Sequence, residues 1–429
     1  MKALIVSATV YPHPNADRVQ LATAGGYQVV VGPEAKTGDL GILFPPDAQI
    51  SEPYCVANKL LRKDGGYFGD NRRVAVQRFR GARSEAFWSP LDSLAFTGAD
   101  LAALKDGQAL NELGGVELCR RWINPETLRA RAAGQASGVK GSVNGEVPWF
   151  KKHTETEQLR HAGPLDFPAG SRVYITEKLH GTSHRVGMVP DPGTDKGAVR
   201  RALDRVAGKL GYQAASRYRL VSGSRRVVLK AGQPDSFHGG TFRDEATAVW
   251  AWRLHPGEVV YGEIVGYSAP GSPIMATHSP ASSSLASVKG MAGPIVYHYG
   301  QPDGLCRFYC YRIVQHRPDG SELELTWEQM AARCGELDIE TVPLLDCVAG
   351  YRRGSTDLLT WAVKVAEVFD SETAPVSTLS DAHPLEGVCI RIERPDGRVV
   401  HLKRKSFAFC ELEGIAANKP GHVDLEEAA

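Results

Sequence analysis

A run of β-branched residues that ends beside a lysine and a glycine is the feature that most constrains how this chain folds. The run is Val173-Tyr174-Ile175-Thr176, Lys178 follows it, and Gly181 comes shortly after the lysine. β-Branched and aromatic residues favour strands, so Lys178 is expected at the end of a strand. A glycine close by lets a ligand approach the backbone closely. The segment therefore predicts a strand end that presents an amine to a bound molecule.

A lysine amine in such a place can act as a covalent nucleophile. It can attack the α-phosphate of a nucleoside triphosphate and hold the nucleotide as a phosphoramidate. A solvent-exposed lysine at a strand end is the structural alternative. Later segments favour the chemical interpretation, because they supply the residue types that such a reaction needs, in strand-like surroundings. These segments are Ser224-Arg225, the β-run 259–266 with Glu263, the aromatic run 308–313 with Tyr309 and Tyr311, Glu386-Gly387, and Lys403 with Lys405.

Each of these residues has a chemical reason to be near a triphosphate. Lys403 and Lys405 share one strand face by the two-residue period and can neutralise phosphate charge. Glu263 and Glu386 can hold a hydrated Mg²⁺ or Mn²⁺, because hard cations prefer carboxylate and water oxygens. An aromatic ring can stack on a base, a contact worth roughly 1–3 kcal/mol. Taken singly, each has a structural alternative: a lone glutamate in a strand usually faces solvent, the two lysines can simply be solvated, and Tyr309 and Tyr311 are more often core residues.

Overall charge does not identify the ligand. The chain has 429 residues with 50 Lys+Arg and 49 Asp+Glu, so any basic surface for nucleic acid must be local. Two candidate clusters are 72–83, with five arginines, and 398–405; each is also typical of a solvated face. The eight cysteines lack zinc-site spacing and are expected to be reduced thiols. The short apolar N-terminus is interpreted as a strand, so a cytoplasmic protein without membrane association is expected.

The organisation along the chain predicts two domains. Residues 1–110 contain short strand-like runs punctuated by Gly and Pro, with a hairpin at Gly25-Gly26, which suits a small barrel of the OB type. Residues 111–149 are expected to be a helical and flexible linker, with a helix near 124–133. Residues 150–429 mix strands and helices, as in an α+β domain, and the segments near 190–218 and 267–292 have the composition of insertions.

The segment Glu177-Lys178-Leu179-His180-Gly181-Thr182 resembles the nucleotidyl-acceptor motif of ATP-dependent RNA ligases, members of the covalent nucleotidyltransferase superfamily. Thr156-Glu157-Gln158 resembles a stretch that lies near the purine in the branch that seals nicks. His13-Pro14-Asn15-Ala16-Asp17-Arg18 is similar to the opening of OB modules, including those in front of one branch of RNA ligases. The resemblance implies an N-terminal all-β OB-type barrel followed by an α+β nucleotidyltransferase (ATP-grasp-like ligase) domain.

The resemblance also implies roles for individual residues. Lys178 would carry AMP, with Glu263, Glu386, Lys403 and Lys405 as the other catalytic residues and the two glutamates holding the metal. ATP would be bound by Glu157, Gln158, Glu177, His180, Gly181 and Arg225 and by an aromatic ring, either Tyr311 or Tyr309. The partner would be RNA, or a duplex containing RNA, with 3′-OH and 5′-phosphate ends; no protein partner is evident.

Two alternatives remain open from the sequence. A DNA ligase or a capping enzyme of the same superfamily usually carries Asp two residues after the lysine, where this chain has His180. A non-catalytic RNA-binding protein would be expected to have lost at least one of the lysines or glutamates named above. In one departure from the family pattern, Arg312 stands where relatives often carry an acidic residue.

Overall fold

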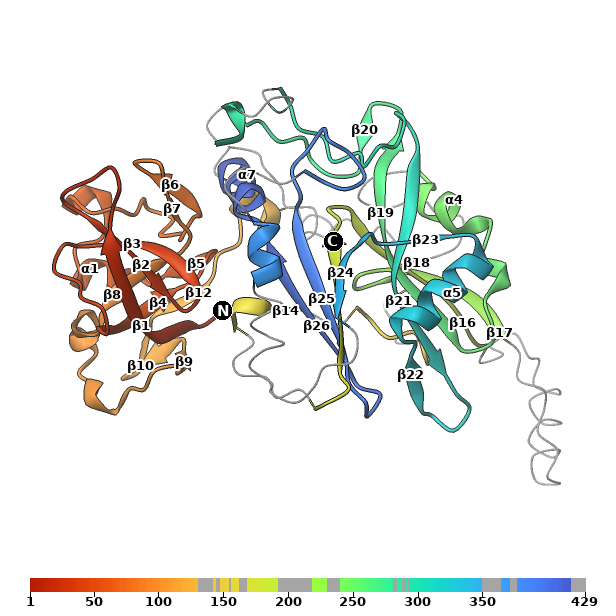
Figure 1. The fold of residues 1–429 in the computed structure, drawn as a ribbon, viewed down its shortest axis with the longest axis horizontal. Coiled ribbons are helices and arrows are strands. Elements are labelled where there is room, and N and C mark those ends of the chain that lie inside the picture. The colour runs from red at the N-terminus through yellow and green to blue at the C-terminus, as the bar shows by residue number, and fades with distance from the viewer. Residues whose placement is uncertain are drawn as a thin grey trace.

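The computed structural model describes most of the chain. The described residues are 1–129, 142–143, 147–153, 156–161, 168–191, 218–229, 240–280, 284–287, 291, 293–348, 364–370 and 376–417. They form a strand-rich N-terminal module and a larger mixed α/β domain, with helix α7 of the larger domain facing the module (Figure 1). The segment predicted as an insertion at 190–218, with its helix, lies almost entirely outside the described residues.

The N-terminal module is a curled antiparallel sheet in the order β3-β2-β1-β4-β8, with β9 also paired to β1. Its strands are β1 (Ala3–Pro12), β2 (Gln20–Ala24), β3 (Tyr27–Val31), β4 (Leu40–Phe44), β8 (Phe87–Pro90) and β9 (Ala109–Leu110). The predicted hairpin is confirmed: Gly25 and Gly26 join β2 to β3 with φ of 55° and 78°, which a glycine adopts without strain. The early half of β1 pairs with β4 and its later half with β2, so the sheet bends around its longest strand.

Shorter elements complete this module. They are β5 (Ala48–Ile50), α1 (Glu52–Ala57), β6 (Gln77–Phe79), β7 (Ala82–Ser84), β10 (Glu112–Leu113), β11 (Val116–Glu117) and β12 (Cys119–Arg121). β12 pairs with β5, so strand pairing continues into the segment expected to be linker. Strands of two or three residues are too short to give an alternating pattern in the sequence. Within the expected linker helix, residues 125–129 are helical and the rest lies outside the described residues.

The larger domain contains two sheets. One has the order β14-β26-β25-β15-β24, and the other β13-β18-β17-β16-β19-β21-β22, with β20 paired to β19 and β23 to β21. The first comprises β14 (Glu157–Gln158), β15 (Arg172–Lys178), β24 (Leu344–Val348), β25 (Gly387–Glu393) and β26 (Val399–Lys405). The second comprises β13 (Ser142–Val143), β16 (Thr182–Pro190), β17 (Tyr218–Ser224), β18 (Val228–Leu229), β19 (Glu258–Ala269), β20 (Ser272–Pro273), β21 (Cys306–His316), β22 (Glu322–Glu324) and β23 (Glu340–Thr341).

In the described part of the larger domain, helices α4 (Phe242–Ala248), α5 (Trp327–Leu337) and α7 (Phe407–Ala417) pack around these sheets. The largest apolar core includes residues from α4, α5, α7 and strands β19 and β21. The segment predicted as an insertion at 267–292 contributes Ile274, Met275, Leu285 and Met291 to this core. Its described part is therefore packed against the domain.

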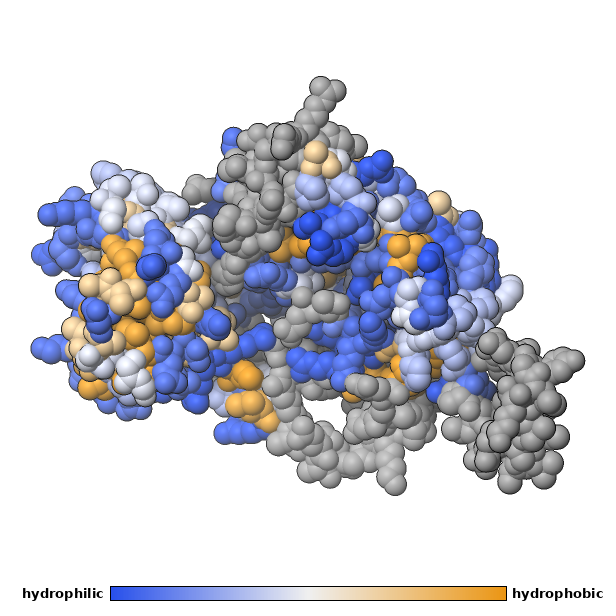
Figure 2. Space-filling view, turned by 90° about the horizontal axis from the view of Figure 1, so that it is seen from below, coloured by the Kyte–Doolittle hydropathy of each residue, from blue (hydrophilic) through white to orange (hydrophobic). Residues whose placement is uncertain are grey.

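Surface properties differ between the two parts. In the view from below, hydrophobic residues are prominent over the N-terminal module, while hydrophilic residues predominate on the larger domain (Figure 2). No helix in the described part of the chain is long and apolar enough to cross a membrane. All eight cysteines are free thiols, and Cys55, Cys119, Cys310 and Cys334 are buried.

Candidate active site

Lys178 stands where the two sheets of the larger domain meet. It is the last residue of β15, and β16 begins at Thr182 in the other sheet, so the link of Leu179, His180 and Gly181 crosses from one sheet to the other. Leu179 and His180 are buried and anchor this link. Because its strand ends here, the lysine side chain projects from the sheet edge into the space between the sheets.

Glu386 is the closest acidic partner of that lysine. Its Oε1 atom lies 2.5 Å from Lys178 Nζ, and the Glu386 side chain is fully buried. Gly387, next in the chain, pairs with Lys178 on one side and Lys405 on the other. A Cβ atom on Gly387 would lie 2.1 Å from the Arg404 carbonyl oxygen, so only glycine lets β26 approach this closely. The Glu-Gly pair thus sets the spacing between the two lysines.

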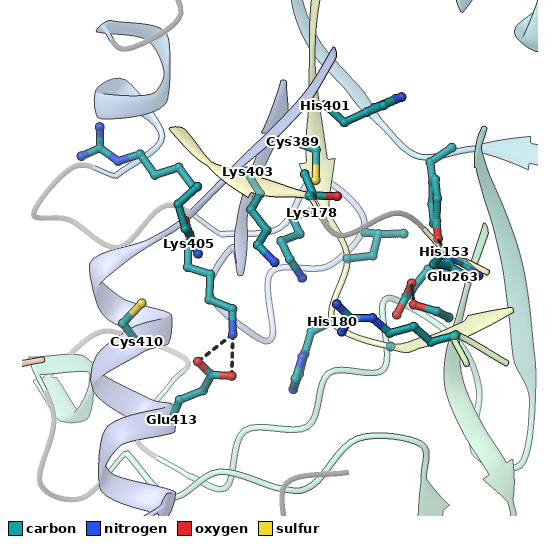
Figure 3. Close-up of a pocket in the computed structure, with 18 of the residues that line it drawn as sticks. His153, Lys178, His180, Glu263, Cys389, His401, Lys403, Lys405, Cys410 and Glu413 are labelled. Atoms are coloured by element: carbon teal, nitrogen blue, oxygen red, sulfur yellow. Dashed lines mark hydrogen bonds and ion pairs between the residues drawn. The ribbon is translucent and has the colours of Figure 1, made fainter. Parts of the chain in front are cut away.

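Lys403 and Lys405 lie on the cleft side of β26. Figure 3 shows the Lys403 side chain ending beside Lys178, while the Lys405 side chain runs towards Glu413; both line the cleft. Lys405 Nζ lies 4.0 Å from Glu386 and 2.8 Å from both carboxylate oxygens of Glu413 on α7. Arg404, between them, turns to the opposite face and pairs with Asp370. All three side chains line parts of the cleft, but the alternation along β26 places Arg404 on the other face of the strand, where Asp370 pairs with it.

Glu263 enters from the second sheet. It lies on β19 directly opposite Ser183, whose hydroxyl donates a hydrogen bond to Glu263 Oε2 at 3.1 Å. The glutamate is buried apart from its edge on the cleft, as Figure 3 shows. Glu263 thus lines the cleft from the second sheet, whereas Glu386 is buried in the first sheet behind Lys178, at 2.5 Å from its Nζ atom. Among the described residues, no group of three or more His, Cys, Asp or Glu could hold a metal ion.

Tyr311, and not Tyr309, lines the cleft. The β19–β21 register shifts between Tyr261 and Gly262, which leaves Tyr311 without a direct partner on β19. Such a bulge re-aims side chains. The Tyr311 hydroxyl lies 2.5 Å from His153 Nδ1. Tyr309 is 2% exposed, belongs to the apolar core and is absent from the cleft lining. Of the two tyrosines, Tyr311 is therefore the one placed in the cleft, and its stacking on a base stays a prediction.

His153 is a cleft residue that sequence reasoning did not assign. It packs edge-on against Tyr261 and Tyr311. Burial, and then the charge of Arg185 and Arg225, lower the pKa of His153 to about 3, so its ring is neutral at physiological pH. Burial also raises the pKa of the Tyr311 hydroxyl well above its ordinary value. No spacing rule links His153 to β21, so its position depends on the tertiary fold alone.

Of the other residues predicted to bind ATP, some line the cleft and one lies outside it. Gln158, His180, Gly181 and Arg225 line the cleft. Glu157 does not: its side chain is exposed, because β14 pairs in parallel with β26 and presents Gln158 to the cleft instead. Glu157 thus lies outside the cleft lining, and a role for it in ATP binding stays a prediction.

Glu177 has a structural partner at the edge of the cleft. It is 1% exposed, and its carboxylate accepts hydrogen bonds from the Thr378 backbone N–H at 3.0 Å and the Thr378 hydroxyl at 2.5 Å. Glu177 thereby anchors the segment around residue 378 against β15. His180 is buried beside Tyr297, His278 and Phe409, and its backbone N–H donates to the Tyr299 hydroxyl at 2.6 Å.

The two predicted basic clusters are not simple cationic surfaces. In the first, Arg73 pairs with Asp47 at 2.7 Å and stacks on Trp122, while Arg78 and Arg83 lie over the ring of Phe407 in the larger domain. In the second, Arg398 pairs with Asp396. Arg78 and Arg83 therefore contact the larger domain, whereas Arg73 lines the cleft, and nucleic-acid binding by this cluster stays a prediction.

A buried charge network borders the cleft near β22. Glu324 accepts from His401 at 2.7 Å and pairs with Arg312 at 2.7 Å and Arg391 at 2.9 Å. Burial alone would raise the pKa of Glu324, but the hydrogen bond and charge of His401, with those of the two arginines, outweigh it and lower the pKa to about 2. Arg312, the departure from the family pattern, is thus neutralised by a carboxylate from the next strand.

The cleft as a whole has a volume of about 720 Å³ and extends from Lys178 to the N-terminal module. Residues of that module and its continuation, among them Arg73, Arg121 and Trp122, complete one wall. A space of this size, with cationic side chains from several strands around one lysine, can hold a nucleotide and part of a polyanion.

Comparison with known proteins identifies the family. The profile of the RNA ligase family matches residues 171–405, more than half of the chain. A search of curated proteins finds no match. Among solved structures, a mutant Naegleria gruberi RNA ligase with AMP and Mn is 19% identical to this chain and gives a TM-score of 0.57. The match covers 95% of this chain and 98% of the Naegleria chain.

Two further structures of the same ligase agree with this result. A mutant with ATP and Mn is 18% identical with a TM-score of 0.56, over 95% of this chain and 98% of that one. The enzyme with PPi is 18% identical and gives a TM-score of 0.55; the match covers 95% of this chain and 97% of that one. At this level of identity the structures show a shared fold, and the family itself follows from the profile match. This chain belongs to the RNA ligase family.

Proposed function

We propose that this protein is an ATP-dependent RNA ligase that joins a 3′-OH end to a 5′-phosphate end through a covalent lysyl-AMP. The observation that carries the proposal is the contact between Lys178 and the buried Glu386 in a cleft that Lys403 and Lys405 also face. Structures of the similar Naegleria gruberi ligase contain ATP, AMP or PPi; ATP and PPi are the substrate and released product of this first step, and AMP is the group transferred to the lysine.

The residues suggest how the first step proceeds. Lys178 Nζ attacks the α-phosphorus of ATP; an N–P bond forms, the bond to the bridging oxygen breaks, and pyrophosphate leaves. Glu386 Oε1, at 2.5 Å, is the nearest group to take a proton from Nζ. Lys403 and Lys405 offset the negative charge that develops on the phosphates. Tyr311 supplies a ring for stacking on adenine.

Two further transfers complete the reaction. AMP passes from Lys178 to the 5′-phosphate of the RNA, which restores the free amine. The 3′-OH then attacks that phosphate, releases AMP and leaves a phosphodiester. The cleft wall with Arg73, Arg121 and Trp122 is where we expect the RNA ends to approach.

Glu263 and Glu386 are the residues that would hold Mg²⁺ or Mn²⁺. Two carboxylates from different sheets suit a hydrated cation that takes its remaining ligands from phosphate and water, which is how Mg²⁺ is commonly bound. When bound, the cation would supply charge stabilisation for the phosphates. The lack of a larger ligand cluster among the described residues agrees with that type of site.

We assign residues 1–110 to an OB-type nucleic-acid-binding domain, 111–149 to a connecting region and 150–429 to the adenylyltransferase domain. The curled antiparallel sheet supports the first assignment. Beyond residue 110, β12 (Cys119–Arg121) pairs with β5 of the module in a separate two-stranded sheet. The preferred substrate under this proposal is a nick in a duplex with an RNA 3′-OH end. A cytoplasmic location remains a prediction from the sequence.

The test is a sealing assay with matched substrates. Nicked duplexes that carry either an RNA or a DNA 3′-OH end are incubated with ATP or GTP and a divalent cation. The proposal predicts sealing that needs ATP and favours the RNA end. Preference for the DNA end would support the alternative of a DNA ligase, and a stable product with GTP alone would support a capping-type enzyme.

A further inference from the structure

A single buried carboxylate connects the N-terminal module to the strand that carries the cleft lysines. Asp370 follows a helical turn at 364–368, and its side chain is 4% exposed. It pairs with Arg404 at 3.0 Å, Arg83 at 3.6 Å and Arg160 at 3.7 Å. Its Oδ1 atom also accepts the Phe407 backbone N–H at 2.6 Å, at the start of α7. These partners come from three separate parts of the chain.

Two of these arginines reach the N-terminal module. Arg83 belongs to β7 of that module, donates to the Asp370 carbonyl oxygen at 2.8 Å and lies over the ring of Phe407. Arg160, which follows β14, pairs with Glu85 of the module at 2.8 Å and lies 4.5 Å from the ring centre of Tyr27. Both arginine side chains are less than 15% exposed. Water is therefore largely excluded from this junction, which strengthens each charge contact.

The third arginine and Phe407 connect Asp370 to the active site. Arg404 lies between Lys403 and Lys405 on β26 and points to the opposite face. Phe407 opens α7, the helix whose Glu413 holds Lys405 at 2.8 Å. One carboxylate thus fixes both the strand that presents Lys405 and the helix that pairs with it.

We propose that Asp370 is a positioning residue for lysine adenylylation, which fixes Lys405 by holding β26 and α7 against the docked N-terminal module. This inference rests on the proposed function, because it assigns the docked module a part in the first chemical step. Loss of the Asp370 charge would leave three arginines close together without their shared partner. Their mutual repulsion would favour separation of the N-terminal module from β26 and α7. A displacement of about 1 Å at a catalytic group can slow a reaction by roughly a hundredfold.

The experiment measures lysyl-AMP formation by the full-length protein. The variants are Asp370→Asn, Arg83→Met, the double variant, and Glu258→Gln as a matched control. Glu258 is also a buried carboxylate paired with an arginine, Arg333 at 2.8 Å, but it lies away from the cleft lining. The rate at saturating ATP, the ATP concentration at half-maximal rate and the thermal unfolding midpoint are measured for each.

The inference predicts that Asp370→Asn lowers the maximal rate by roughly tenfold to a hundredfold. Arg83→Met lowers it in the same direction, and the double variant is no slower than Asp370→Asn alone, because both act through one junction. Glu258→Gln lowers the unfolding midpoint but keeps the wild-type rate. This separates positioning from a general loss of stability.

Three results would overturn the inference. One is a wild-type rate in folded Asp370→Asn and Arg83→Met; if Asp370→Asn does not fold, Arg83→Met alone decides. Another is an equal loss of rate in Glu258→Gln. The third is additive loss in the double variant. If the wild-type protein itself forms no lysyl-AMP, the proposed function fails first, and that outcome is distinct from all three.

Discussion

Replacing Tyr311 with leucine should weaken ATP binding, whereas the same change at Tyr309 should not. Tyr311 lines the cleft and Tyr309 is buried in the core. Loss of stacking on a base costs roughly 1–3 kcal/mol, which corresponds to about a fivefold to 150-fold rise in the ATP concentration at half-maximal rate. Leucine keeps an apolar side chain but removes the aromatic ring at both positions, so the comparison tests which ring contacts the base.

A third variant separates the ring from its hydroxyl. Tyr311→Phe keeps the stacking surface but removes the contact of 2.5 Å with His153 Nδ1. A buried group left without its hydrogen bond costs about 1–3 kcal/mol of stability. We therefore expect Tyr311→Phe to lower the unfolding midpoint while ATP affinity stays close to that of the wild type.

The assay is the dependence of lysyl-AMP formation on ATP concentration, with thermal unfolding measured in parallel. Tyr309→Leu is expected to unfold at a lower temperature with an unchanged ATP requirement. The reasoning is refuted if Tyr309→Leu, still folded, raises the ATP requirement and Tyr311→Leu does not. That result would mean that the purine lies on the other side of β21.

Three further predictions concern the charged groups. Lys178→Ala should abolish covalent labelling by ATP. It should also lower the unfolding midpoint, because the buried Glu386 loses its partner at 2.5 Å. The double variant Lys178→Ala/Glu386→Ala should regain part of the lost midpoint, and no recovery would contradict the pairing. Glu263→Ala should slow lysyl-AMP formation by orders of magnitude in rapid-quench assays while circular dichroism stays unchanged, whereas a normal rate would make this carboxylate structural. The pKa of His153 is lowered from 6.5 to about 3, so the unfolded chain binds a proton that the folded one does not; the free energy of unfolding should therefore fall as pH drops from about 6.5 towards about 3. His153→Phe should make that slope shallower in urea titrations, and an unchanged slope would contradict the assignment.

Local patterns allowed much of the larger domain to be predicted. Lys178, Glu263 and Glu386 lie on or beside strands that β-rich runs in the sequence indicated. The two-residue period of β26 placed Lys403 and Lys405 on one face, and the structure has both lining the cleft. These features depend on residues close in the sequence, whose alternation survives in the folded sheet.

Features that arise from tertiary contacts could not be predicted in this way. A one-residue bulge decided between Tyr309 and Tyr311, and such an irregularity leaves no mark on composition. The arginines of the N-terminal module looked like a cationic surface because their partners, Phe407 and Asp370, are distant in the chain. Charge clusters in a sequence do not reveal which members are neutralised after folding.

The most direct test of the account is covalent labelling with α-labelled ATP. The full-length protein is incubated with α-labelled ATP or GTP in the presence of Mg²⁺ or Mn²⁺, separated under denaturing conditions and digested, and the labelled peptide is sequenced. The account predicts label from ATP alone, attached to Lys178 and released by pyrophosphate. Label on another residue, or equal label from GTP, would contradict it.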